Sequence, residues 1–368
     1  MGVTLMAFNI PEYETVKTYR ISVRILSANY LILSLLVFCM VFFGLRNCPD
    51  DIFPFPVLLI STSQGFIFAY ALVSLYAPKN FARKKVLYYN ILPLSLLIIL
   101  YGVFAAFLGD PVCTSIPDFF SKLLHPTIFI RLLLLVFNIF QIVFYNSMVQ
   151  KLSVRYTQYL NQYYSDTIQL KPQWAKKNFY MAVMVGLMSI ISSLFKDVLI
   201  DTIFTVLFCI YYFLFAIMYM QYEEIFKKLE PEFIEDLTQR NPVQKIISGE
   251  KKFCGFNWLT AKRHIIDKKL YLQSGVTVND MAEFFNTNRT TFSTLLNKNE
   301  GQNFNSFINT LRIEHAKQLL IENPQLSIVE ISQQCGYTEQ SNFTRQFKLL
   351  CNETPAAWVK MQRKCTEV

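Results

Sequence analysis

Two segments of the chain combine side chains that form directional hydrogen bonds. One begins at Arg289 and continues with threonines and a serine, and the other begins at Gln340 and includes Asn342 and Arg345. A guanidinium group donates two parallel hydrogen bonds, and a carboxamide both donates and accepts. As types, the amides suit adenine and arginine suits guanine. These residue types predict non-covalent recognition of a hydrogen-bonding surface and no covalent chemistry.

Residues for catalysis or metal binding are missing from the same sequence. There is no nucleophile elbow and no phosphate loop, and the eight Cys and three His show no metal-ligand spacing. We therefore expect no enzyme activity, no cofactor and no metal.

Each polar segment follows a short predicted helix with a marked start. Thr277 and Asp280, and fifty residues later Ser327 and Glu330, form the hydroxyl-x-x-acid pattern of a capping box, with the shorter Asp making the first a weaker version. Small residues, Ala282 and Ser332, let two helices approach. Asn286 and Gly336 suit the left-handed backbone of a tight turn before the next helix.

A long helix is predicted between the two pairs, from Phe304 to Ile321, with Pro324 after its end. Thr354 and Pro355 open a last helix, because proline is preorganised at a first helical position. The pattern therefore predicts two helix-turn-helix units on one connecting helix.

This arrangement resembles the C-terminal domain of the AraC/XylS family of bacterial transcription regulators. The resemblance covers about residues 257–363 and rests on the runs LRIEHAK (311–317), SIVEISQQCGY (327–337) and SNFTRQFK (341–348). It implies that the second helix of each unit enters the major groove of double-stranded DNA. By position, the implied base contacts are Arg289, Thr290, Thr291, Ser293, Thr294, Glu339, Gln340, Ser341, Asn342, Thr344 and Arg345.

The two units differ in charge. Thr294 stands where the family often has a basic residue, whereas Arg345 fills the matching place in the second unit, so we expect the second unit to contribute more. Lys298 and Lys348 suit phosphates, which position the protein without specifying sequence. The alternative for the Thr and Ser side chains is a solvated helix face. Four apolar side chains are expected in the core: Phe292, Leu296, Phe343 and Phe347.

The first half of the chain is of a different class. The chain is 53% hydrophobic and only 17% charged, and roughly 20 apolar residues span a hydrocarbon core. The sequence predicts an all-α protein: a tail (1–24), a six-helix transmembrane domain (25–220), a linker (221–256) and a soluble all-α domain (257–368). The predicted spans are residues 25–44, 52–76, 86–108, 128–149, 179–195 and 198–220.

Basic residues alternate between the connections. The N-terminal tail and the second and fourth connections hold twelve Lys and Arg, against three in the other connections. Because basic loops stay in the cytoplasm, we expect an inner-membrane protein with both termini cytoplasmic. The net charge of +9 belongs mostly to this topology, so the DNA prediction depends on pattern alone.

Several polar residues lie within the predicted spans. Asn138, Gln141 and Tyr145 share one helix face and should point into the bundle, either as interhelical hydrogen bonds or as the lining of a signal site. Arg131, Asp197 and Asp201 are charged. A pair of Arg131 with Asp201 that joins the fourth and sixth spans and a ligand site are both open.

Two further features are a pair of cysteines in loops and an apolar and aromatic stripe beyond the fourth span. Cys48 and Cys113 fall in predicted external loops and are either bridged or free thiols. A stripe of Leu152, Tyr156, Tyr159, Leu160 and Tyr163 extends the fourth span, and interfacial anchoring is its plain explanation. Dimerisation through the linker stays open.

The sequence therefore predicts a membrane-anchored, sequence-specific DNA-binding transcription regulator. The membrane bundle would sense an unknown ligand or membrane partner, and the chain would act alone or as a homodimer. The alternative is a transporter or channel-like bundle with a helical protein-interaction tail, which predicts flux in vesicles and no operator.

Overall fold

The computed structural model describes residues 2–7, 17–42, 51–76, 87–192, 198–229 and 257–366. Within them every regular element is a helix, apart from one isolated β-bridge between Tyr164 and Thr277. The predicted all-α class is confirmed for this part of the chain. Two compact units emerge: Met1–Tyr156 with Pro172–Thr238, and Thr157–Lys171 with Gln239–Val368.

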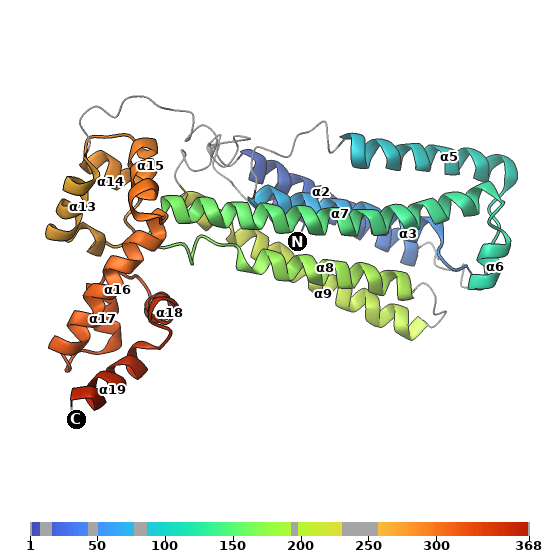
Figure 1. Cartoon of the computed structure of the whole chain (residues 1–368). Coiled ribbons are helices and arrows are strands. Elements are labelled where there is room, and N and C mark those ends of the chain that lie inside the picture. The colour runs from blue at the N-terminus through green and yellow to red at the C-terminus, as the bar shows by residue number, and fades with distance from the viewer. Residues whose placement is uncertain are drawn as a thin grey trace. The chain divides into compact units, whose positions relative to one another are not determined.

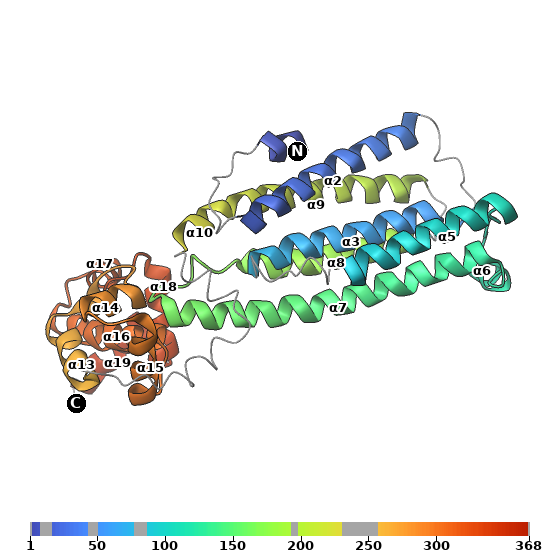
Figure 2. The same ribbon diagram turned by 90° about the horizontal axis from the view of Figure 1, so that it is seen from above.

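The first unit consists mainly of long helices that run alongside one another (Figures 1 and 2). Helix α2 packs on α3, α3 on α8, and α8 on α9. The elements of this unit are α1 (Gly2–Ala7), α2 (Lys17–Phe42), α3 (Phe55–Tyr76), η2 (Leu87–Ile91), α5 (Leu92–Leu108), α6 (Ile116–Ser121), α7 (Pro126–Tyr163), α8 (Gln173–Ser192), α9 (Val198–Gln221) and α10 (Glu223–Lys228).

Four helical stretches are long and apolar enough to cross a membrane, by length and composition. They are Phe55–Tyr76, Tyr88–Leu108, Pro126–Tyr163 and Thr202–Ile225, and they match the second, third, fourth and sixth predicted spans. The first and fifth predicted spans lie on α2 and α8 and run on into residues outside the described ones. A membrane domain is thus supported by four helices.

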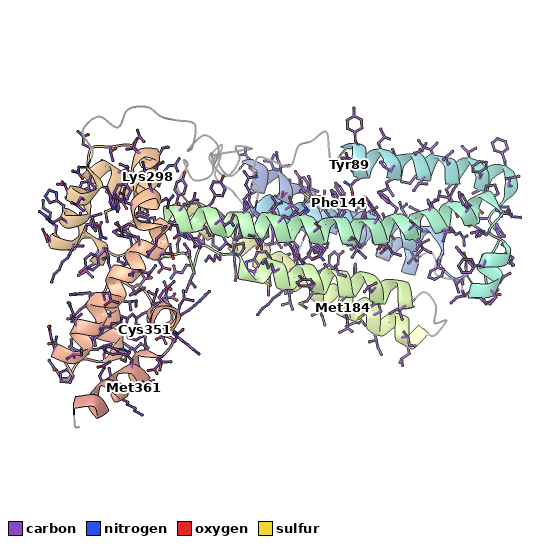
Figure 3. The ribbon with its side chains drawn as sticks, viewed as in Figure 1. Tyr89, Phe144, Met184, Lys298, Cys351 and Met361 are labelled. Atoms are coloured by element: carbon purple, nitrogen blue, oxygen red, sulfur yellow. The ribbon has the colours of Figure 1, made fainter. Side chains whose placement is uncertain are left out.

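Large apolar side chains of α5, α7 and α9 point outward, whereas α3 has none that is exposed. No residue of α5 is buried, and the window of Tyr88–Leu108 has a mean hydropathy of 2.5. In Figure 3, Tyr89 of η2 and Phe144 of α7 extend from neighbouring helices, and their ring centroids lie 6.5 Å apart. Outward apolar side chains are the pattern that a lipid environment requires.

An aromatic cluster fills the other side of the unit, where α2, α8 and α9 meet. Trp174 packs edge-on against Phe215 and Tyr222, with ring centroids 6.2 Å apart in both pairs. The buried Tyr19 hydroxyl donates to the Tyr219 carbonyl at 2.7 Å. Tyrosines can be buried here because their hydroxyls find partners on neighbouring helices.

The second unit holds a chain of shorter helices. After the stretch of Thr157–Lys171 it contains α13 (Trp258–Asp267), η3 (Leu270–Leu272), α14 (Val278–Phe284), α15 (Arg289–Glu300), α16 (Phe304–Glu322), α17 (Ile328–Gln334), α18 (Gln340–Cys351) and α19 (Pro355–Thr366). The domain boundaries predicted from the sequence leave Thr157–Lys171 with the membrane part, whereas the structure groups it with the C-terminal helices.

Candidate nucleic-acid interface and the polar cluster of the bundle

The first helix pair is α14 followed by α15. Thr277 accepts from the Asp280 amide at 3.2 Å and Asp280 accepts from the Thr277 amide at 2.7 Å, so the predicted capping box is complete despite its shorter acid. Asn286 has φ of 50°, the left-handed turn expected of it. A signal that the sequence analysis missed is Asn288, whose side chain caps α15 by accepting from the Thr291 amide at 2.8 Å.

The second pair, α17 and α18, repeats this construction. Ser327 and Glu330 form the predicted capping box, with the Ser327 amide donating to Glu330 at 2.7 Å. Gly336 has φ of 80°, and a Cβ there would overlap the carbonyl oxygen of Leu272 in η3. Glycine is therefore required at this turn both for its backbone angle and for the close approach of η3.

Helix α16 joins the two pairs and is centred on a buried arginine. Arg312 is fully buried; its Nε donates to the Tyr271 carbonyl at 2.7 Å and its Nη2 to the Gln273 carbonyl at 2.8 Å. The guanidinium also lies 5.1 Å from the ring centroid of Tyr337, whose hydroxyl donates to Asn309 at 2.8 Å. One side chain thus connects the η3 region, which precedes α14, to the turn between α17 and α18.

Two further contacts complete the domain. Helix α13 is tied to the end of α15, because Trp258 Nε1 and Lys262 Nζ each donate to Glu300 at 2.8 Å. In the second unit, burial raises the pKa of the Cys335 thiol to about 12, against the opposing effect of Arg312. The thiol is therefore neutral and protected at ordinary pH.

The outer faces of α15 and α18 carry most of the predicted contact residues. The four apolar residues expected in the core, Phe292, Leu296, Phe343 and Phe347, are buried as predicted. Exposed residues are Thr290, Lys298 (Figure 3), Glu339, Gln340, Ser341, Arg345 and Lys348, and half-buried ones are Arg289, Thr291, Ser293, Thr294 and Thr344.

Asn342 differs from this expectation. Only 2% of it is exposed, and its Oδ1 has no hydrogen-bond partner among the described residues. Asn342 directly precedes Phe343 on α18 and shares the inward side of the helix with it, so it does not present its amide to a ligand in this conformation. The sequence placed it by counting along the motif, which does not resolve the edge of a helix face.

The charged cluster of the first unit has other members than the sequence suggested. Arg131 is 1% exposed; its Nη1 donates to both Asp51 oxygens, at 3.0 and 2.9 Å, and its Nη2 contacts Asp110. Tyr101 also donates to Asp110, at 2.6 Å. Among the described residues, the partners of Arg131 are thus Asp51 and Asp110, which the sequence did not suggest. The expected pair of Arg131 with Asp201 stays a prediction.

The remaining predicted residues of the bundle divide in two groups. Asn138 donates to Ser61 at 3.3 Å, and Gln141 and Tyr145 both donate to Asn90, at 3.2 and 2.6 Å. The expected inward face is therefore confirmed, with interhelical hydrogen bonds as its visible role. Asp197, the side chain of Asp201 and Cys48 lie outside the described residues; Cys113 carries a free, buried thiol, so its bridge to Cys48 stays a prediction.

The C-terminal helices match a known domain. Residues 281–361 fit the family model described as "Helix-turn-helix domain". Over 87 residues the chain is 31% identical to the Msm operon regulatory protein of Streptococcus mutans, a match that covers 24% of this chain and 31% of that protein. It is 35% identical over 85 residues to the lactose operon transcription activator of Staphylococcus xylosus, covering 22% of this chain and 30% of that protein.

A helix-turn-helix type transcriptional regulator of Staphylococcus aureus is also similar, with 29% identity over 87 residues, 24% of this chain and 12% of that protein. No solved structure gives a significant match. The chain thus matches less than a third of the length of the first two relatives. The C-terminal domain is an AraC-type helix-turn-helix DNA-binding domain. Such domains bind DNA and are not enzymes, so the prediction of no enzyme activity is confirmed for this part of the chain.

Proposed function

We propose that this protein is a membrane-anchored, sequence-specific DNA-binding transcription regulator. The observation that carries the proposal is the presence, in one chain, of two capped helix-turn-helix units with exposed polar residues at their second helices and of four helices apolar enough to cross a membrane. The similar proteins named as operon regulators support the same function.

The proposal includes an orientation. Six spans with the basic connections inside place both termini in the cytoplasm, where the domain reaches DNA in a bacterium. Base recognition would use the exposed residues of α15 and α18, with Gln340, Ser341 and Arg345 foremost, and Lys298 and Lys348 would contact phosphates. Asn342 would take part only if α18 rearranged.

The test is chromatin immunoprecipitation of the tagged full-length protein, with the membrane fraction assayed in parallel. We expect discrete promoter fragments to be enriched while the protein stays in the membrane fraction. An Arg345→Ala chain, equally abundant in the membrane, should lose this enrichment. Uniform background with wild type, together with solute flux in vesicles, would support the transporter alternative and overturn the proposal.

We further propose that the Arg131 cluster receives the signal. Arg131 Nε is buried without a hydrogen-bond partner among the described residues, and an ionisable group at membrane depth is a candidate for function. Asp110→Asn should change promoter occupancy without loss from the membrane. Asp118→Asn is the matched control, because Asp118 pairs with Lys122 at a partly exposed site; equal effects of both changes would reject the Arg131 cluster as the signal site.

A further inference from the structure

Residues 163–171, called here the docking segment, lie against the helix-turn-helix domain within the second unit. Tyr164 and Thr277 form an antiparallel β-bridge, and the Ser165 amide donates to the Val276 carbonyl at 3.2 Å. Tyr163, Tyr164 and Ser165 are all buried. The segment is therefore paired, backbone to backbone, with the residues that open α14.

Two asparagines of α16 hold the same part of the segment. Asn305 Nδ2 donates to the carbonyls of Tyr164 and Ser165, at 3.1 and 2.8 Å, and Asn309 Nδ2 donates to the Ser165 carbonyl at 3.0 Å. Asn309 also accepts from Tyr337. Since buried amides must be satisfied, the domain carries a polar receptor site for an extended backbone.

The two ends of the segment contact the starts of α15 and α18, the second helices of the two helix-turn-helix units. Tyr163 lies under the guanidinium of Arg289, the first residue of α15, with 4.5 Å from Cζ to the ring centroid. At the start of α18, Gln169 Nε2 donates to Glu339 Oε1 at 2.8 Å. Thr338, one residue earlier, donates to Asp166 at 3.1 Å.

The length of the segment explains how it reaches both helices. Gln169 is six positions after Tyr163, and a chain of that length spans up to about 20 Å when extended. Both hydrogen bonds at α18 are exposed, and each joins one neutral group to one carboxylate, so water competes with them. The contact at α18 is thus weak by construction, whereas the contact at α14 and α16 is buried.

Charge adds a penalty that favours release. Lys171 has a lowered pKa, caused first by burial and second by the nearby charge of Arg345, with Asp166 opposing. Lys171 thus places a second positive charge near Arg345 of α18, at the residue expected to contact DNA. DNA phosphates would relieve this repulsion only where the segment has moved away.

We propose that the docking segment engages Arg289 at the start of α15 and Glu339 at the start of α18, two of the expected base contacts, so that segment binding and DNA binding exclude each other. Release of the segment is then the step through which the connection between α7 and α8 controls the domain. This inference rests on the proposed DNA-binding function. Its thermodynamic consequence is that the apparent affinity for DNA equals the intrinsic affinity multiplied by the fraction of molecules with the segment released.

The first test compares DNA affinity of full-length variants in phospholipid nanodiscs. The probe is a duplex recovered by the immunoprecipitation, with an unrelated duplex of equal length beside it. The change is Asp166→Ala with Gln169→Ala, which removes both contacts at α18 and no predicted DNA contact. We expect affinity for the probe to rise about threefold to tenfold, because two exposed hydrogen bonds are lost from the docked state.

Gln162→Ala is the matched control, since Gln162 directly precedes the segment and its side chain has no hydrogen bond among the described residues. It should leave the affinity unchanged. An unchanged or weaker affinity of the double variant for the probe duplex overturns the inference, because it would show that the docked segment does not oppose DNA binding.

The second test needs no variant. Hydrogen exchange of the wild-type protein in nanodiscs is followed for peptides covering residues 163–171 with and without the probe duplex. Faster exchange of the Ser165 amide on saturation with DNA supports exclusion. Unchanged protection at saturation overturns it while leaving DNA binding intact. If no duplex binds while the amides of the C-terminal helices stay protected from exchange, so that the domain is folded, the proposed function itself is overturned.

Discussion

Arg345 and Lys348 lie three residues apart on α18, and both are exposed. Their chemistry assigns them different parts in the proposed complex. A guanidinium can form two parallel hydrogen bonds with one base, whereas an ammonium acts as a point charge toward phosphate. The pair therefore separates sequence recognition from general attraction within one helix.

We predict that Arg345→Ala lowers the binding free energy for the specific duplex by about 1–3 kcal/mol and that discrimination against one base pair is lost. Lys348→Ala should weaken specific and unrelated duplexes alike and reduce the salt slope of binding by about one. Titrations of both variants at several salt concentrations measure this. Equal loss on both duplexes from Arg345→Ala would show that Arg345 contacts phosphate only.

At Arg312, as at Arg345, the planar guanidinium group matters more than the positive charge alone. Its guanidinium donates to two carbonyls of the η3 region, through Nε and Nη2, while fully buried. Burial lowers the pKa of Arg312, with Tyr337 opposing most among the neighbouring groups. The planar group is needed because both carbonyls must be reached from fixed directions.

We predict that Arg312→Lys destabilises the domain by about 2–3 kcal/mol, since one buried carbonyl loses its donor and the ammonium is poorly placed for the other. Cys335 reports the change in the full-length protein, because its thiol is buried. Alkylation of Cys335, followed by mass spectrometry, should accelerate about tenfold or more. Lys317→Ala, which removes the partly exposed pair with Glu314 on the same helix and a contact with Cys351, should change the rate little; equal rates in the two variants would contradict the prediction.

At the scale of elements, the turn between α17 and α18 requires a glycine more strictly than the end of α15 does. Gly336 has φ of 80°, and Gly301, which ends α15, has φ of 67°. The two glycines share the left-handed angle but differ in surroundings. A Cβ at Gly336 would overlap Leu272, whereas a Cβ at Gly301 would meet nothing within 4 Å.

We predict that Gly301→Ala costs about 1 kcal/mol, the cost of the left-handed angle alone, and that Gly336→Ala costs about 3 kcal/mol or more because η3 must also move. Hydrogen exchange of peptides from α16 and α17 measures the difference in the full-length protein. Similar exchange in the two variants would mean that η3 yields without cost and that the overlap is harmless.

The elements that local chemistry defines were predictable from the sequence. Capping boxes need only the residues of one helical turn. The turn residues Asn286 and Gly336, the connecting helix from Phe304 and the proline start at Pro355 follow in the same way, and the structure has all of them. The expected inward face of Asn138 and Gln141 needed only helical periodicity.

What the sequence did not predict depends on contacts between distant residues. Asp51 and Asp110 reach Arg131 from connections that flank α3 and α5, and no spacing along the chain encodes that meeting. Tyr163 lies against Arg289, a contact between residues far apart in the chain that the helical stripe does not indicate. The burial of Asn342 likewise depends on how α18 packs.

At the scale of the whole molecule, the proposed function depends on topology. The domain meets DNA only if the chain leaves the last span on the cytoplasmic side. With an even number of spans, the N-terminal tail then lies on the same side. Twelve basic residues in the tail and two alternate connections favour this orientation, because translocating them is costly. The four helices found by composition leave α2 and α8 as the two spans to be tested.

We predict that Leu124→Cys, at a position that is 98% exposed in the turn before α7, reacts with a membrane-impermeant thiol reagent in intact cells. Lys228→Cys, at the end of α10, should react only after permeabilisation. Peptide-resolved mass spectrometry reads both sites with the native cysteines in place. Protection of both until permeabilisation would leave an even number of crossings between them, and labelling of both in intact cells would do the same and put the DNA-binding domain outside. Only opposite labelling leaves an odd number of crossings between Leu124 and Lys228, which α7, α8 and α9 supply together and α7 and α9 alone do not. The experiment therefore decides whether α8 crosses the membrane.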